Sequence, residues 1–161
     1  MKKILVFDCD LTEDYSAIAL STHLKDYKLC WNLNTVLDIN LQKNTNFVSS
    51  KKKPNLEEYS FFYHEDKEQR SVLCLLANKK NNVLLLDKMP ETDFLLLIKG
   101  KMSADKIKAM IKTIRSITNI LTAFVINMAK YSEMNSLLSD LELHCIQVLP
   151  KEEKRKGKEG V

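Results

Sequence analysis

The sequence predicts a single α+β domain, in which an antiparallel sheet of five to six strands carries two main helices packed on one face. The 161 residues are 45% hydrophobic and 29% charged, with three Gly and three Pro, a composition typical of one compact domain. Between residues 59 and 99, four apolar runs follow one another with no space for crossover helices, which indicates antiparallel pairing. Two further segments have the apolar spacing of amphipathic helices. We expect one domain over residues 1–150 and a flexible charged tail over 151–161.

The first part of the chain predicts two strands and a long helix. Residues 3–9, KILVFDC, form an apolar strand that both faces of a sheet could bury. Residues 15–21 alternate in the manner of a second, short strand. From Thr22 to Leu41 there is neither Pro nor Gly, and apolar residues recur at helical spacing, so this segment predicts the first main helix.

The middle of the chain predicts a loop and then a meander. Residues 43–56 are polar and contain the triplet Lys51, Lys52 and Lys53, which is typical of a surface loop. The four apolar runs that follow are separated by short polar turns and predict four antiparallel strands, at residues 59–65, 71–78, 83–87 and 93–99.

The last part predicts the second main helix, from Ser103 to Thr118. Ser103 is suited to cap the free amides of the first turn, and Asp105 complements the helix dipole there. Residues 120–127 predict another strand. Residues 141–149 are expected to form a final strand, with a helical piece between the two.

Asp8 and Asp10, followed by Thr12, are the low-odds candidates for catalytic residues. The pattern Asp-x-Asp-x-Thr at a strand end resembles the nucleophile motif of the haloacid-dehalogenase superfamily of magnesium-dependent phosphohydrolases. That chemistry needs a metal and further acidic ligands, and no later Asp-Asp pair or alternating strand–helix pattern supplies them. The favoured interpretation is that both acids end a strand and face solvent; binding of a cation or a basic partner is the other interpretation.

No cofactor or metal ligand set is evident in the sequence. The three histidines are scattered, and the four cysteines, about 20 or more residues apart, lack the short spacing of zinc ligands or redox pairs. We interpret them as buried free thiols in a cytoplasmic protein. Neither a signal peptide nor an apolar segment of membrane-spanning length is present in the sequence, so no membrane association is expected.

Aromatic and basic residues suggest an interaction surface. Tyr59, Phe61 and Tyr63 would share one face of a strand, an arrangement with which single-stranded RNA readers stack bases. Lys51, Lys52 and Lys53 could contact phosphates. A core or a protein interface uses the same aromatic pattern, and that interpretation is favoured here.

Five phrases spread over much of residues 4–127 point to a family: HLKDYKLCWNLN at 23–34, FFYHED at 61–66, LLANK at 75–79, DFLLLIKG at 93–100 and IRSITNILTAF at 114–124. In these the chain resembles the IPExxxVDY family of uncharacterised Bacteroidota proteins. Met89, Pro90 and Glu91 correspond to the Ile-Pro-Glu of the naming motif, and the spacer before Asp93-Phe94 is shorter. The resemblance implies a small cytoplasmic bacterial protein and supplies no site residues.

The sequence therefore favours a non-enzymatic protein-interaction or assembly module. Because a small sheet has open edge strands, homodimerisation is one expectation and binding of another protein is the other. An RNA-associated protein and a magnesium-dependent phosphohydrolase are the alternative hypotheses.

Overall fold

The structure is a computed structural model that describes residues 11–49 and 57–149. Several features predicted from the sequence lie outside these residues. They are the strand at 3–9 with Asp8 and Asp10, the triplet Lys51, Lys52 and Lys53, and the charged tail at 151–161.

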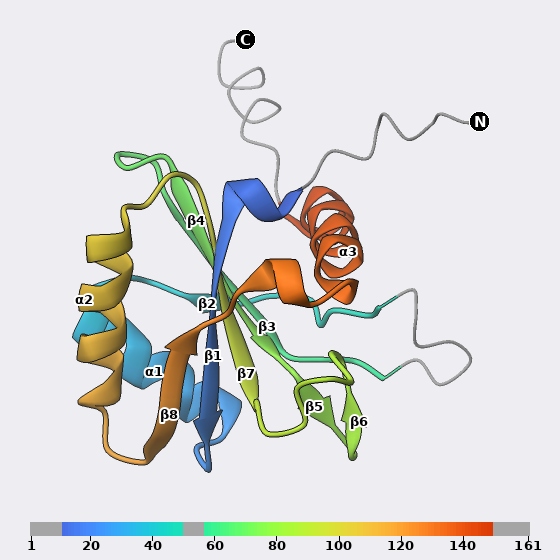
Figure 1. The fold of residues 1–161 in the computed structure, drawn as a ribbon, viewed down its shortest axis with the longest axis horizontal. Helices are drawn as coiled ribbons and strands as arrows, with labels where there is room; N and C mark the ends of the chain where they lie inside the picture. The colour runs from blue at the N-terminus through green and yellow to red at the C-terminus, as the bar shows by residue number, and fades with distance from the viewer. Residues whose placement is uncertain (1–10, 50–56, 150–161) are drawn as a thin grey trace, which may run out of the picture.

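A six-stranded antiparallel sheet forms the centre of the molecule, which confirms the predicted α+β class (Figure 1). The strand order is β2-β3-β4-β7-β1-β8. The strands are β1 (Tyr15–Thr22), β2 (Gln42–Lys43), β3 (Phe61–Asp66), β4 (Ser71–Ala77), β7 (Phe94–Lys99) and β8 (Ile120–Val125). A 3-10 turn, η2 (Leu11–Asp14), leads into β1, and another, η4 (Met128–Lys130), follows β8.

The central strand β7 pairs with β4 on one side and with β1 on the other. In this register Leu96 lies opposite both Leu75 of β4 and Ile18 of β1. The first described strand is thus inserted between β7 and β8, while β3 and β4 form a hairpin that continues the sheet in the other direction. The β8 side ends in a six-residue edge strand and the other side in the two-residue β2.

Helices cover both faces of the sheet. The helices α1 (Asp26–Leu37) and α2 (Ala104–Arg115) lie on one face, as predicted, and α3 (Glu133–Val148) lies on the other (Figure 1). The four consecutive apolar residues Leu95, Leu96, Leu97 and Ile98 are accordingly all fully buried. In the described part of the chain, no helix combines the length and the hydrophobicity that crossing a bilayer requires.

The first helix is shorter than the predicted span from Thr22 to Leu41. Thr22 ends β1 instead, and its hydroxyl donates to the Asn119 carbonyl at 2.7 Å. At the other end, Asp38 adopts the left-handed conformation, with φ of 56°, and its N–H donates to the Asn34 carbonyl. This cap ends the helix because a residue in that conformation cannot continue it.

The second helix begins as the sequence predicts. The Ser103 hydroxyl accepts a hydrogen bond from the Lys106 amide at 3.2 Å and so caps the first turn. The helix ends at Arg115, three residues before the predicted end at Thr118, and Ser116 is its C-cap.

The predicted strand at 83–87 is wrong for most of its length. Only β6 (Val83–Leu84) pairs, with β5 (Lys79–Lys80), in a separate two-stranded ladder. Leu85 and Leu86 are buried in the following loop, which the side chain of Asn78 holds by three hydrogen bonds. Burial of apolar residues in a loop has no distinct signature in the sequence, so the run resembles a strand.

The predicted final strand at 141–149 is also wrong, because residues 141–148 belong to α3 and Leu149 is its C-cap. Buried residues recur along it at helical spacing: Met134, Leu137, Leu138 and Leu141. Leu143 and Ile146 lie on the exposed side of the helix. Because buried residues recur at helical spacing, the segment packs one helix face against the sheet and forms a helix and not a strand.

Candidate functional site

The aromatic surface predicted for base stacking is not exposed in the structure. Tyr59 and Phe61 are fully buried, and Tyr63 is half-buried. The ring of His144, from α3, meets the Phe61 ring edge-on at a centroid distance of 4.8 Å. Burial is also the main cause of the raised pKa of the Tyr59 hydroxyl. Tyr59 and Phe61 are therefore core residues, which agrees with the core interpretation and leaves neither side chain available to stack on a base.

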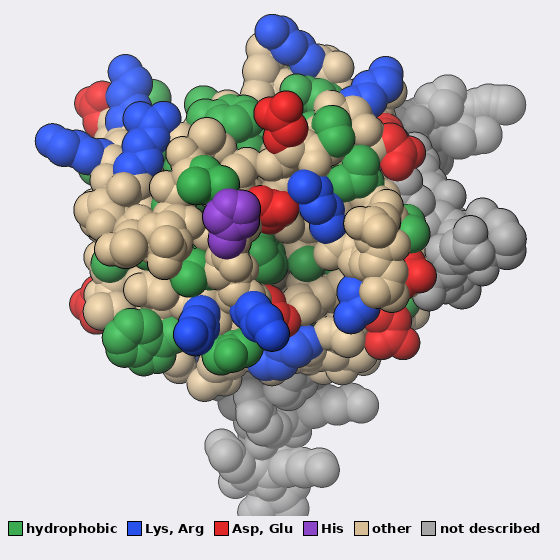
Figure 2. Space-filling view, turned by 90° about the horizontal axis from the view of Figure 1, so that it is seen from below, with side chains coloured by type: hydrophobic (Ala, Val, Ile, Leu, Met, Phe, Trp, Pro, Cys, Tyr) green, Lys and Arg blue, Asp and Glu red, His purple; other side chains and the backbone are tan. Residues whose placement is uncertain are grey.

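Cationic side chains do not merge into one surface at the lower end of the sheet. Figure 2 shows Lys and Arg in several separate groups on this face, with acidic and apolar side chains between them. A backbone-binding nucleic-acid site requires a continuous basic track. This face does not provide one.

The strand β8 carries the exposed apolar side chains at the sheet edge. It pairs with β1 on one side, and no described strand pairs with its other side. Leu121, Phe124 and Val125 are 57%, 43% and 52% exposed. Single exposed apolar residues are ordinary, but three on one unpaired edge strand, Leu121 and Val125 on one face and Phe124 on the other, make this edge suited to a protein partner.

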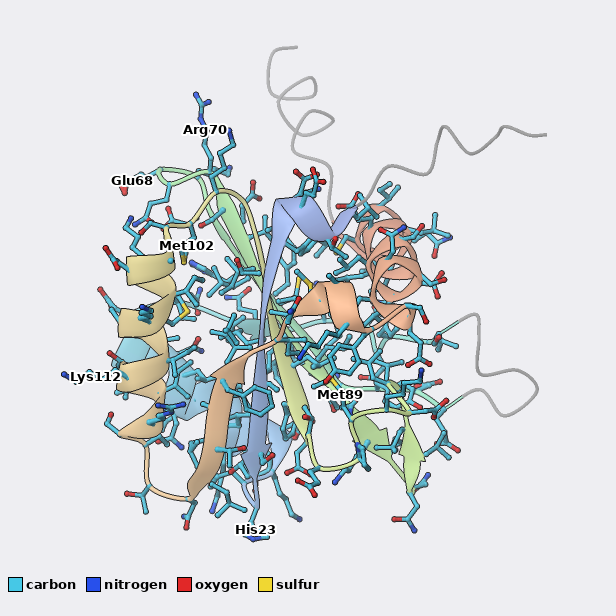
Figure 3. All side chains as sticks on the ribbon, viewed as in Figure 1. His23, Glu68, Arg70, Met89, Met102 and Lys112 are labelled. Carbon is cyan, nitrogen blue, oxygen red and sulfur yellow. The ribbon has the colours of Figure 1, made fainter. Side chains whose placement is uncertain are left out.

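A groove of about 410 Å³ lies where α2 borders β8. Its apolar part comes from Ile111, Phe124 and Val125, and its cationic rim comes from Lys108, Lys112 and Arg115. The amphipathic pattern of α2 creates this arrangement, because Ile111 turns toward the sheet and the lysines turn outward. The side chain of Lys112 points away from the helix into solvent (Figure 3).

Arg115 fixes one end of the groove. Its guanidinium donates to the Ala123 carbonyl through Nε at 3.0 Å and Nη2 at 2.6 Å. The Ile126 amide donates to Ala17 of β1, so the two-residue alternation of an antiparallel strand directs the Ala123 carbonyl away from β1. Arg115 thus binds one of the backbone carbonyls on the unpaired side of β8, that of Ala123. Its guanidinium has three further N–H donors, which can bind a carboxylate.

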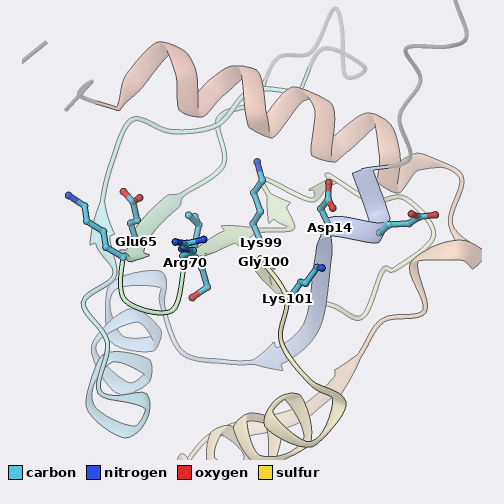
Figure 4. A pocket seen from close by; sticks show the side chains of 10 residues that line it. Asp14, Glu65, Arg70, Lys99, Gly100 and Lys101 are labelled. Carbon is cyan, nitrogen blue, oxygen red and sulfur yellow. The ribbon is translucent and has the colours of Figure 1, made fainter. Parts of the chain in front are cut away.

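A second hollow, of about 510 Å³, lies at the upper end of the sheet (Figure 4). The β3–β4 turn, the end of β7 and the residues before β1 line it. Its charged residues are of both signs: Lys67, Arg70, Lys99, Lys101, Glu13, Asp14 and Glu65. Because the signs are mixed, the lining does not select a ligand of one charge.

A polar cluster beside this hollow joins α3 to the sheet. The carboxylate of Glu142 accepts hydrogen bonds at Oε2 from Lys99 Nζ at 2.6 Å and from the Tyr15 hydroxyl at 2.9 Å. Burial acts to raise the pKa of Glu142, but the hydrogen bonds from Lys99 and Tyr15 outweigh it and lower that pKa below its ordinary value. Burial first, and the carboxylate second, raise the pKa of Tyr15 well above its ordinary value. Lys99 and Tyr15 therefore hold Glu142 as an anion that bridges β7, β1 and α3.

The described residues offer no metal centre. Within residues 11–49 and 57–149, no group of three or more His, Cys, Asp or Glu side chains could hold a metal ion. Two of the histidines have structural contacts instead: His64 Nδ1 accepts from the Asn40 amide at 3.3 Å, and His144 Nε2 lies 2.8 Å from the Thr45 carbonyl.

Sequence reasoning missed the groove, although part of its signal was visible. The apolar run at 120–127 predicts a strand, and the lysines of the second helix are visible in the sequence. Nothing in a single apolar run shows that its strand lies at the sheet edge, because that depends on which strands pair with it.

Comparisons with known proteins do not assign the chain to a family. No family model matches the chain, and no curated protein and no solved structure is significantly similar to it.

Proposed function

We propose that this protein is a non-enzymatic interaction module that binds an acidic, partly apolar segment of a partner protein in the groove between α2 and β8. The observation that supports the proposal is the combination, in one groove, of two exposed apolar residues of an edge strand, Phe124 and Val125, with three cationic side chains. The apolar residues favour association with another protein, and the cations select the charge of the partner.

The apolar contribution comes from the edge strand. Covering Phe124 and Val125 removes apolar surface from water, at about 25 cal/mol per Å² buried. An aromatic anchor beside a groove is also the arrangement that contributes most at protein interfaces. A partner segment with two or three apolar side chains could use these contacts.

The charge of the surface favours an acidic partner over a second copy of the chain. The helix α2 contains the cations Lys106, Lys108, Lys112 and Arg115 and one acidic residue, Asp105, while β8 has no charged residue. An isologous contact at this edge would bring two identical cationic rims together, which costs free energy. Asp and Glu side chains of a partner would instead pair with the rim, and Arg115 is already held in position to receive one.

A phage-displayed library of 12-residue peptides tests the proposal with the full chain as bait. We expect enriched peptides to combine Asp or Glu with large apolar residues. For a synthetic copy of an enriched peptide, the double variant Lys112→Glu/Arg115→Glu should weaken binding at least about tenfold in fluorescence anisotropy, because exposed charge pairs contribute roughly 0.2–1 kcal/mol each and repulsion replaces them. Lys106→Glu, on the same helix but outside the groove lining, is the matched control and should change the affinity little.

Any of four results would contradict the proposal. Peptides without acidic residues could be enriched, or the double variant Lys112→Glu/Arg115→Glu could bind as tightly as the unmodified chain. Sedimentation could show a dimer that Phe124→Glu dissociates, which would assign the edge to a second copy. Preferential binding of a poly(U) oligonucleotide over the peptides would favour the RNA hypothesis instead.

A further inference from the structure

Two cysteine thiols face each other between the sheet and α3. Cys74 lies in β4 and Cys145 lies near the end of α3, and a side-chain hydrogen bond joins the two thiols. Both are free thiols; Cys74 is buried and Cys145 is partly exposed. Residues 71 positions apart in the chain thus have their thiols within hydrogen-bonding range, an arrangement that the spacing of the cysteines in the sequence does not reveal.

We propose that Cys74 and Cys145 form a reversible oxidation site, in which Cys145 attacks a peroxide and Cys74 then closes an intramolecular disulfide. The partly exposed sulfur is accessible to a molecule as small as hydrogen peroxide, whereas the buried sulfur is shielded. Each thiol therefore has a distinct part in the reaction, Cys145 as the attacking group and Cys74 as the resolving group.

Charged and polar groups around the pair support this division. Lys99, Glu142 and Tyr15 all interact electrostatically with Cys145 or Cys74. Lys99 is paired with Glu142, and the cation favours a thiolate at Cys145 while the Glu142 carboxylate opposes it. The ring of His144, the neighbouring residue in α3, is directed toward Phe47 and Phe61 instead.

The two thiols also differ in acidity in the direction that the division requires. The hydrogen bond with Cys74 is the largest influence on Cys145 and lowers its pKa, Lys99 acts in the same direction, and burial and Glu142 oppose them. The hydrogen bond with Cys145 and then burial raise the pKa of Cys74. Both shifts make Cys145 the more acidic thiol of the pair, and the thiolate is the reactive form of a cysteine.

The reaction balances with hydrogen peroxide as the oxidant. The Cys145 thiolate attacks one peroxide oxygen, an S–O bond forms, the O–O bond breaks, and hydroxide leaves and takes up a proton to become water. The Cys74 sulfur then attacks the sulfenic acid, the S–S bond forms, and the S–O bond breaks with release of a second water. Two thiols are oxidised to a disulfide and one peroxide is reduced; a dithiol such as dithiothreitol reverses the oxidation.

The third described cysteine is the natural comparison. The Cys30 thiol donates to the Leu41 carbonyl at 3.4 Å and accepts from the Asn34 side chain at 3.7 Å. Burial raises its pKa, and no other described cysteine is recorded as its partner. We therefore expect it to react slowly and to form no cross-link within the folded domain.

Intact mass spectrometry and peptide mapping of the full chain, treated with a few equivalents of hydrogen peroxide, test the site. The expected result is a loss of two hydrogens per chain, a mapped Cys74–Cys145 cross-link, and recovery of both thiols with dithiothreitol. Cys74→Ser should leave a Cys145 sulfenic acid that dimedone traps, Cys145→Ser should abolish both products, and Cys30→Ser should behave like the unmodified chain. A cross-link that involves Cys9 or Cys30 instead, no cross-link, or equal peroxide reactivity of Cys30 and Cys145 would overturn the proposal.

The pH dependence of alkylation separates a reactive thiol from a merely accessible one. Lys99→Met should shift the iodoacetamide alkylation profile of Cys145 to higher pH, because Lys99 is the cation that stabilises its thiolate. Lys101→Met, two residues further along and not among the groups that act on Cys145, should leave the profile unchanged. Identical profiles for the two variants would contradict the role given to Lys99.

Discussion

A single buried amide, that of Asn78, organises the loop between β5 and β7. Its side chain accepts from the Leu86 amide at 2.8 Å and donates to the Met89 and Thr92 carbonyls at 3.1 and 2.9 Å. Both hydrogens of its amide group and the amide oxygen thus have a partner in this loop, although Asn78 is fully buried. Met89, Pro90 and Glu91 thus lie in a loop that the Asn78 side chain holds at three points.

Replacing Asn78 should destabilise the fold strongly. Asn78→Ala leaves an amide and two carbonyls of the loop without their partner, and each buried unsatisfied group costs about 1–3 kcal/mol. We expect the free energy of unfolding to fall by about 2–4 kcal/mol in urea denaturation. Asn32→Ala is the control: the Asn32 side chain donates only to the Lys28 carbonyl on the surface of α1, so its loss should cost less than about 0.5 kcal/mol. Equal effects of the two variants would contradict the role of Asn78.

Glu142 predicts how stability depends on pH. Its pKa in the folded protein is lower than the ordinary value of 4.5 that we assign to the unfolded chain. The carboxylate therefore stabilises the fold above pH 4.5, and this contribution is lost as the pH falls through the folded pKa.

The stability difference between the unmodified protein and Glu142→Gln should accordingly be largest at neutral pH and should shrink below pH 4.5. Because the carboxylate is partly exposed, we expect a difference of about 1 kcal/mol or less. Denaturation from pH 7 to 3.5 measures it, with Glu68→Gln, at the exposed β3–β4 turn, as control. A difference that stays constant over this range would show that Glu142 acts through packing and not through its charge.

The helix α3 shows how an element can be mistaken when its two halves are interpreted separately. In a strand, Leu141 and Leu143 would lie on the same face, because side chains alternate with a period of two. In the helix they are about 200° apart, so Leu141 is buried and Leu143 is 55% exposed.

A pair of alanine substitutions distinguishes these structures. Leu141→Ala should cost about 2–5 kcal/mol of unfolding free energy, since it leaves a cavity beneath α3. Leu143→Ala should cost less than about 0.5 kcal/mol, because the side chain lies on the outer face. Similar losses for the two variants in chemical denaturation would support the strand that the sequence predicted.

Other elements follow from the sequence because local chemistry determines them. The strands β3, β4, β7 and β8 were expected within one or two residues of their observed bounds, and the Ser103 cap of α2 was identified correctly. The end of α1 was not, because the left-handed Asp38 is stabilised by a bond that its N–H makes to Asn34. Asp at such a position is uncommon enough that the sequence provides no stop signal.

At the scale of the molecule, the strands are protected from solvent to different degrees by the three layers, which are α1 with α2, the sheet, and α3. The strand β7 pairs on both sides and is covered by helices on both faces, whereas β8 has one described pairing partner and β5 and β6 pair only with each other. Backbone amides exchange with solvent according to the free energy of the opening that exposes them.

Native-state hydrogen exchange should reflect this arrangement. We expect the slowest exchange at amides of β7 and β1 that bond to neighbouring strands, intermediate exchange in β8, and the fastest in the β5–β6 ladder. Hydrogen–deuterium exchange with peptide-level mass spectrometry measures the order. Exchange in β7 as fast as in β5 and β6 would contradict a core built on both faces of the sheet.

The candidate sites were less predictable than the fold. Asp8, Asp10 and the three lysines were selected as charged motifs and lie outside the described residues, while Tyr59 and Phe61 proved to be core residues. The groove beside β8 and the contact between Cys74 and Cys145 each join segments that are distant in the chain. No local sequence pattern marks such sites. Each of the two contributing segments, taken alone, looks like an ordinary buried strand or solvated helix.

The sequence alone was sufficient for the α+β class, the two helices on one face and most of the strands, because hydrophobic periodicity and capping act within a few residues. Only the tertiary structure decided that α3 covers the second face, that β8 is left at the edge, and which two thiols meet. These features depend on which apolar surfaces, distant in the sequence, pack against one another. The burial of all these surfaces in one core determines them together.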